Sequence, residues 1–151
     1  MDAKPKPPMP LFQRLYNVIW LSFFECLLIR RWFDHWSVVV LHVLLGVGVL
    51  ALTQANARAL AKMAVPARLK RISAATARIA IAQAMLGLAL GGLDHLALPP
   101  IVRTIAAAFH LVMALTILAQ ASSTATAYDM WEEHEFGEGP APTAAEKPAA
   151  S

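Results

Sequence analysis

The sequence predicts an all-α integral membrane protein built as a four-helix transmembrane bundle, and three observations support this prediction. Of the 151 residues, 58% are hydrophobic and only 15% are charged, whereas soluble domains carry about a quarter of charged residues. Residues 36–57 and 104–128 contain no Asp, Glu, Lys or Arg. At about 1.5 Å rise per residue, each can cross a hydrocarbon core of roughly 30 Å. The charges are sorted by segment and form no aromatic-interleaved basic patch, which argues against nucleic acid as a partner.

The first apolar segment has two interpretations. Residues 1–10 are basic and rich in proline, so we expect them to be disordered. Residues 11–33 form either a short membrane span with arginines reaching toward both interfaces, or an amphipathic helix lying on the membrane surface. The surface interpretation rests on polar residues that share one arc of a helical wheel: Gln13, Arg14, Asn17 and Glu25. We favour the span.

The second helix and the loop after it fix the predicted orientation. Residues 36–57 form the helix, with Trp36 at a membrane interface. Residues 58–71 contain no acid and five basic side chains: Arg58, Lys62, Arg68, Lys70 and Arg71. Because short basic loops stay in the cytoplasm, the predicted third helix, 72–93, runs outward and the fourth, 100–121, returns. We therefore expect a multi-pass protein of the cell (inner) membrane, in contact with the lipid bilayer, whose residues 93–99 face outward.

The third and fourth helices are predicted as a pair joined by a short outer turn. Gly91, Gly92 and Asp94 are stop signals for the third helix. Pro99 and Pro100 suit the first turn of the fourth, where the missing N–H would have no partner in any case. The membrane domain is thus predicted to cover residues 11–124. Residues 125–151 form an acidic segment with the composition of a flexible tail. The predicted orientation of the helices places this tail in the cytoplasm.

Two histidines inside the predicted spans are the candidate functional residues. His42 lies about six residues, and His110 about ten, from the outer ends of their helices, at depths of roughly 9 and 15 Å. An ionisable side chain at such a depth is expensive and marks a functional site. Two imidazoles at similar depth on different helices suit axial ligation of one heme iron, as in b-type cytochromes. We predict a heme, b-type by preference, with small residues leaving room beside it: Gly46, Ala106, Ala114 and Gly87.

Less specific interpretations of the same residues stay open. The pattern Gly87-x-x-x-Gly91 is common at helix contacts, and an intramembrane histidine often only hydrogen-bonds to a neighbouring helix. Gln83 is more typical of an interhelical hydrogen bond than of a site. His35 and His95 lie at the outer boundary, either as solvated loop residues or at the edge of a ligand. The sequence contains no nucleotide-binding loop, HExxH motif or nucleophile elbow.

The order and spacing of these motifs resemble the heme A synthase family. The similarity covers roughly residues 36–121 and rests on three stretches: Leu41-His42-x-x-Leu45-Gly46 followed by a basic inner loop, Gln83-x-x-Leu86-Gly87 before the outer turn Leu98-Pro99-Pro100, and His110-Leu111-x-x-Ala114. Family members commonly contain two four-helix halves, each with paired histidines for heme. The resemblance therefore implies a half-size form working as a homodimer, with His42 and His110 carried over as the ligands.

The family pattern is incomplete in ways that bear on catalysis. The positions of its motif glutamate and of a basic residue hold Val39 and Val43, and its paired outer-loop cysteines are absent because Cys26 is the sole cysteine. The resemblance implies heme A synthesis, an oxidation of a heme methyl group, or heme handling in cytochrome oxidase assembly, and the binding role transfers better than the oxidoreductase role. Two alternatives stay open: a b-type cytochrome electron-transfer or anchor subunit of a respiratory complex, and a cofactor-free or pigment-binding accessory subunit.

Overall fold

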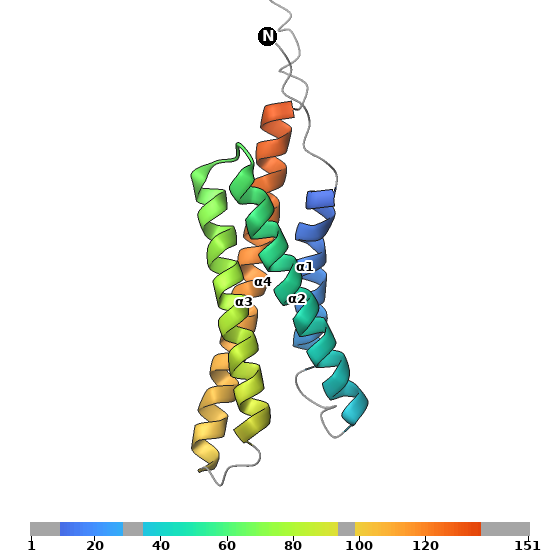
Figure 1. Ribbon diagram of the computed structural model, residues 1–151, viewed down its shortest axis with the longest axis vertical. Helices are drawn as coiled ribbons and strands as arrows, with labels where there is room; N and C mark the ends of the chain where they lie inside the picture. Colours follow the sequence, from blue (N-terminus) through green and yellow to red (C-terminus); the bar gives the residue numbers. More distant parts are fainter. Residues whose placement is uncertain (1–9, 29–34, 94–98, 137–151) are drawn as a thin grey trace, which may run out of the picture.

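The computed structural model describes residues 10–28, 35–93 and 99–136, and within these ranges it is all-helical. Four helices follow one another: α1 (Pro10–Leu27), α2 (Trp36–Lys62), α3 (Ala67–Leu93) and α4 (Pro100–Phe136). They alternate in direction, and each packs against its neighbours in the chain (Figure 1). Because α4 also packs against α1, the helices form a closed four-membered bundle in which α1–α3 and α2–α4 are the diagonal pairs.

Three of the four helices are long and apolar enough to cross a membrane: Trp36–Lys62, Ala67–Gly92 and Pro100–Phe136. The predicted all-helical, four-helix architecture is confirmed to this extent. Helix α1 is not among the three, but it packs lengthwise beside α2 and α4 (Figure 1). Its inward face repeats at helical spacing and carries the buried residues Leu11, Leu15, Val18, Ser22 and Glu25.

The basic segment 58–71 is less of a loop than predicted. Helix α2 continues to Lys62 and α3 begins at Ala67, so only a short linker separates them. The prediction ended the second helix where charged residues begin. In the structure Leu60 is completely buried, which keeps the last turn of α2 packed against the bundle while its charged neighbours face outward. The backbone carbonyl of Pro66 accepts hydrogen bonds from Leu69 and Lys70 as α3 begins.

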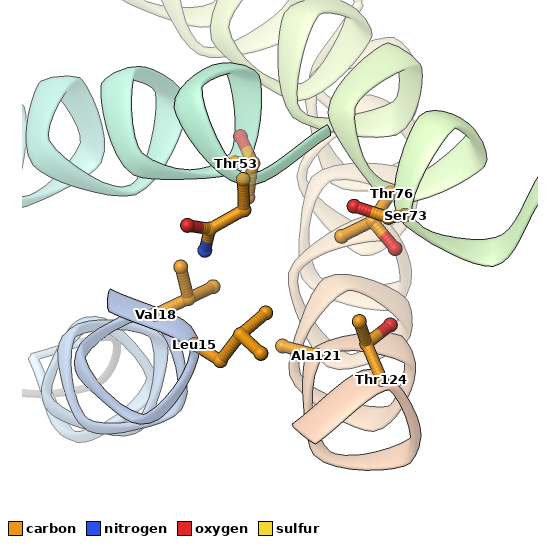
Figure 2. A pocket seen from close by; sticks show the side chains of 8 residues that line it. Leu15, Val18, Thr53, Ser73, Thr76, Ala121 and Thr124 are labelled. Atoms are coloured by element: carbon orange, nitrogen blue, oxygen red, sulfur yellow. The ribbon is translucent and has the colours of Figure 1, made fainter. Parts of the chain in front are cut away.

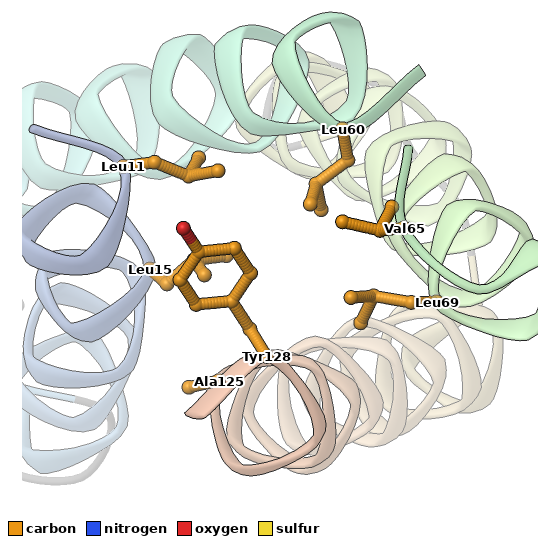
Figure 3. Packing of buried hydrophobic residues seen from close by; sticks show 7 residues of the cluster. All are labelled: Leu11, Leu15, Leu60, Val65, Leu69, Ala125 and Tyr128. Carbon is orange, nitrogen blue, oxygen red and sulfur yellow. The ribbon is translucent and has the colours of Figure 1, made fainter. Parts of the chain in front are cut away.

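Helix α4 also extends past the predicted boundary at residue 124, and the prediction of a flexible segment from residue 125 is wrong as far as Phe136. The extension packs. Tyr128, 1% exposed, lies at the centre of a buried cluster drawn from all four helices and the α2–α3 linker (Figure 3). The other members are Leu11, Leu15, Leu60, Val65, Leu69 and Ala125. The Tyr16 hydroxyl also donates a 2.6 Å hydrogen bond to the Asp129 carboxylate, tying α1 to α4.

A layer of small polar side chains crosses the bundle next to this cluster. It surrounds a cavity of about 10 Å³ (Figure 2), which is close to the volume one water molecule needs. The polar members are Thr53, Asn56, Ser73, Thr76 and Thr124, all buried. Two contacts join neighbouring helices nearby: Gln54 Nε2 donates to the Ala77 carbonyl at 2.8 Å, and Thr76 Oγ1 lies 2.9 Å from Gln120 Oε1. Such polar contacts hold helices together where lipid offers no hydrophobic driving force.

The opposite half of the bundle is open. The N-terminal part of α2 leans away from α3 and α4 toward the lower end of the molecule (Figure 1). Val49, Ala80 and Ile117 form a second, small buried cluster. All three side chains line a second, much larger cavity. One half of the protein is therefore closely packed, and the other encloses space.

Candidate functional site

The large cavity has a volume of about 310 Å³ and is bordered by all four helices. Most of its lining is apolar, and Val49, Ala80 and Ile117 close it toward the packed half. A mostly apolar wall with a few convergent polar groups is typical of small-molecule and cofactor sites. Five polar side chains reach into the cavity: Ser22, Glu25, His42, Gln83 and His110.

The two predicted histidines face one another across this cavity. The ring centroids of His42 on α2 and His110 on α4 lie 6.1 Å apart, and the ring planes are inclined by 59°. Two imidazoles that share one metal ion at a metal–nitrogen distance of about 2.0 Å have centroids roughly 6 Å apart when they lie on opposite sides of it, and about 5 Å apart in a tetrahedral arrangement. The observed separation therefore fits axial ligation from opposite faces.

A carboxylate from the first helix borders one of the histidines. Glu25 Oε2 lies in direct contact with Nδ1 of His42, and Glu25 is only 8% exposed. The other carboxylate oxygen, Oε1, lies 3.5 Å from the point where a Cβ on Gly46 would stand. Glu25 thus reaches the site from α1 and sits against the small residue one turn beyond His42.

Gly87 determines how close His110 comes to α3. A Cβ at this position would lie 3.0 Å from Cε1 of His110, a separation at which the ring would have to move. The absence of a side chain at Gly87 lets the imidazole rest directly against the α3 backbone. Gly91, on the next turn, differs: a Cβ there would meet no atom within 4 Å. Of the two glycines in the Gly87-x-x-x-Gly91 pattern, Gly87 therefore makes a close contact with another helix, whereas Gly91 does not.

Among the residues that the structure describes, several buried polar atoms at the cavity have no hydrogen-bond partner. They are Ser22 Oγ, Glu25 Oε1, Gln83 Oε1 and His110 Nδ1. A buried polar atom left unsatisfied costs about 1–3 kcal/mol, and such atoms are rare in native structures. Four of them around one cavity indicate that a bound molecule or water completes the site.

Most of the predicted small residues do line the site. Gly46, Gly87 and Ala114 border the cavity together with both histidines, whereas Ala106 does not. His35 is exposed just before α2, and His134 is exposed in the last turn of α4. His95, the arginines at positions 30 and 31, and the acids at 34 and 94 lie outside the described residues.

Glu25, Ser22 and Gln83 were not predicted as site residues. The sequence did contain a signal for the first two. Ser22 and Glu25 continue the helical spacing of Leu15 and Val18, the buried face of α1, but Glu25 was assigned to the polar arc of that helix. Gln83, predicted as an interhelical hydrogen-bonding group, instead turns an unpartnered oxygen toward the cavity.

Within residues 10–28, 35–93 and 99–136, no group of three or more His, Cys, Asp or Glu side chains is placed to hold a bare metal ion. The cavity offers two imidazoles. That donor set suits a metal whose remaining ligands belong to a macrocycle, since heme iron takes only its axial ligands from the protein. Comparison with protein-family models, with curated proteins and with solved structures finds no match for this chain.

Proposed function

We propose that this protein is a heme-binding, multi-pass membrane protein in which His42 and His110 are the axial ligands of one heme iron. The observation that carries the proposal is the 6.1 Å separation of the two imidazole centroids across a mostly apolar cavity. Three helices long and apolar enough to span a membrane support the location. The residues present fit a heme: two facing imidazoles, a glycine at position 87 that makes room for the His110 ring, and buried polar atoms that lack a hydrogen-bond partner among the described residues.

Each group in the cavity has a role in this proposal. When bound, heme supplies one-electron redox chemistry at iron. His42 and His110 would hold the iron from two diagonal helices, and ligation would remove the cost of burying two polar rings. Gly46 leaves room for the Glu25 carboxylate and Gly87 for the His110 ring, while the small side chain of Ala114 lines the cavity. The apolar walls keep water out, which tunes the potential of the centre.

The proposed topology places the short linker between α2 and α3 in the cytoplasm of a cell with an inner membrane, together with the C-terminal end of α4. Five basic residues lie in segment 58–71 without an acid, and positive charge of this kind is retained on the cytoplasmic side. The cavity then lies in the outer half of the membrane.

Within this class, the narrower proposal is heme handling for cytochrome oxidase assembly, as the motif order resembling a heme A synthase half implies. Val39 and Val43 replace the polar residues of the family motif, so binding is assigned ahead of heme methyl oxidation. The second candidate is an electron-transfer or anchor subunit of a respiratory complex. The diagonal histidine pair favours it equally, because such a pair makes a low-spin redox centre.

Absorbance spectroscopy of the purified protein tests the proposal. Expressed with ample heme and measured in the oxidised and dithionite-reduced states, the protein should show a low-spin spectrum with sharp α and β bands. Pyridine hemochrome extraction then separates heme B from heme A and from other pigments. A protein that carries no tetrapyrrole under these conditions would be a cofactor-free accessory subunit, and the proposal would be wrong.

The proposed assembly is a homodimer or a place in a larger respiratory membrane complex. Members of the heme A synthase family commonly contain two four-helix halves. A chain that resembles one half is therefore expected to pair with a second copy if it works in the same way. Native mass spectrometry from mild detergent should show a species heavier than one chain. A monomer that binds heme in full would remove the homodimer while leaving the heme assignment intact.

A further inference from the structure

Glu25 approaches the site from a helix that contributes no histidine. Its Oε2 atom is paired with Nδ1 of His42, and the side chain is 8% exposed. An ionised carboxylate can only accept hydrogen bonds. A carboxylate beside Nδ1 of His42 favours the tautomer with its proton on Nδ1, which leaves the lone pair of the ring on Nε2. This contact between α1 and α2 also orients the imidazole.

The surroundings of Glu25 are shaped to keep this contact. The residue follows Leu15, Val18 and Ser22 on the buried face of α1, so packing of that face sets the height of the carboxylate along α2. On the α2 side, Gly46 lies beside Oε1 of Glu25. A Cβ at position 46 would stand 3.5 Å from this oxygen, which is an ordinary contact distance. A larger side chain at position 46 would press on the carboxylate.

We infer that Glu25 is a positioning residue that orients His42 for iron ligation and increases the electron donation of its imidazole. The inference rests on the proposed function. A carboxylate on the far nitrogen of a ligating histidine orients the ring and raises its basicity, and loss of such a partner typically costs 10- to 100-fold in metal affinity. A more basic ligand favours the ferric over the ferrous state. Glu25 therefore holds the reduction potential of the centre lower than a neutral partner would.

Three substitutions separate orientation from charge. Glu25→Ala removes both, and we expect heme affinity to fall by about 10- to 100-fold. Glu25→Gln keeps a carbonyl acceptor for Nδ1–H but no charge, so the low-spin spectrum should remain while the potential rises. A tenfold preferential weakening of the ferric form corresponds to about 59 mV for this one-electron couple. Glu25→Asp should restore the charge and, in part, the potential.

The matched control is Tyr16→Phe. Tyr16 lies on the same helix and makes another interhelical polar contact, a 2.6 Å hydrogen bond to Asp129, but it does not line the cavity. The substitution should loosen α1 without changing affinity or potential. If Glu25→Ala and Glu25→Gln leave both quantities at the wild-type values, or if Tyr16→Phe shifts them equally, Glu25 has no positioning role and the inference fails while the heme assignment stands.

A measurement without heme makes the two failures distinguishable. In protein carrying ¹⁵N-labelled histidine, the ring nitrogens of His42 report the tautomer directly. Wild-type protein should show the proton on Nδ1, and Glu25→Ala should move the ring toward a mixture of tautomers. A wild-type protein that binds no heme but shows this change would refute the proposed function and keep the orienting contact. An unchanged tautomer would refute the contact itself.

Discussion

His42 and His110 lie with ring centroids 6.1 Å apart although their helices, α2 and α4, form a diagonal pair of the bundle that makes no direct backbone packing. The two side chains span a gap that the helices leave open. Around them the cavity takes up about 310 Å³. A pair of polar rings facing across such a space would be costly in a membrane, and under the proposed function a heme iron bound by both rings would remove that cost.

The first prediction concerns the ligand pair. His42→Ala and His110→Ala each leave one axial ligand, so the spectrum should become high-spin or the heme should be lost, because two strong-field imidazoles are needed for the low-spin state. His35→Ala is the control, since His35 is exposed before α2. It should keep a low-spin centre. Normal low-spin spectra in both the His42 and His110 variants would show that other residues bind the iron.

The second prediction uses the two glycines of α3. Gly87→Ala should displace the His110 ring, because the new Cβ would lie 3.0 Å from Cε1. We expect weaker heme binding and a broadened or partly high-spin spectrum. Gly91→Ala has open space, and alanine is favoured over glycine in a helix by about 1 kcal/mol, so this variant should keep the spectrum and melt at the same or a higher temperature. Equal behaviour of the two variants would contradict the close packing of His110 on α3.

The third prediction concerns the end of α4. Tyr128→Ala empties the centre of the cluster in Figure 3. Loss of a buried aromatic side chain typically costs about 3–5 kcal/mol of stability. The melting temperature should fall clearly in a thermal scan followed by circular dichroism. Met130, two residues further along α4, is 66% exposed, so Met130→Ala should change the melting temperature little. Similar melting of both variants would mean that residues 125–136 do not pack as described.

The fourth prediction is the topology. In a Cys26→Ser background, a cysteine at Ala97 should react with an impermeant thiol reagent added outside intact cells. A cysteine at Ala64, exposed in the linker between α2 and α3, should react only after the cells are opened. The reason is the basic charge of segment 58–71, which retains that end in the cytoplasm. The reverse labelling pattern would place the histidine cavity on the cytoplasmic side.

The sequence by itself determined the helices and the histidine pair. Charge-free runs predicted α2 and α4, prolines predicted the start of α4, and counting residues from the helix ends placed His42 and His110 at similar depth. The structure confirms the helices and brings the two rings together, because helical rise is a fixed length, while their depth in a membrane stays a prediction. The ends of the helices were less predictable. Charge alone was taken to stop α2 and α4, whereas Leu60 and Tyr128 continue each helix by packing on other helices.

The tertiary structure alone decided which face of each helix meets which neighbour. The sequence allowed Glu25 to lie either on the polar arc or on the buried face of α1. Only the packing of α2 against α1 brings its carboxylate into contact with His42. Gly87 and Gly91 are equivalent in sequence, yet only Gly87 lies against an imidazole. Ala106 has the same spacing from His110 as Ala114 but is not among the residues that line the cavity. Helical period fixes which residues share a face, while the rotation of that face toward a partner depends on packing contacts distant in the sequence.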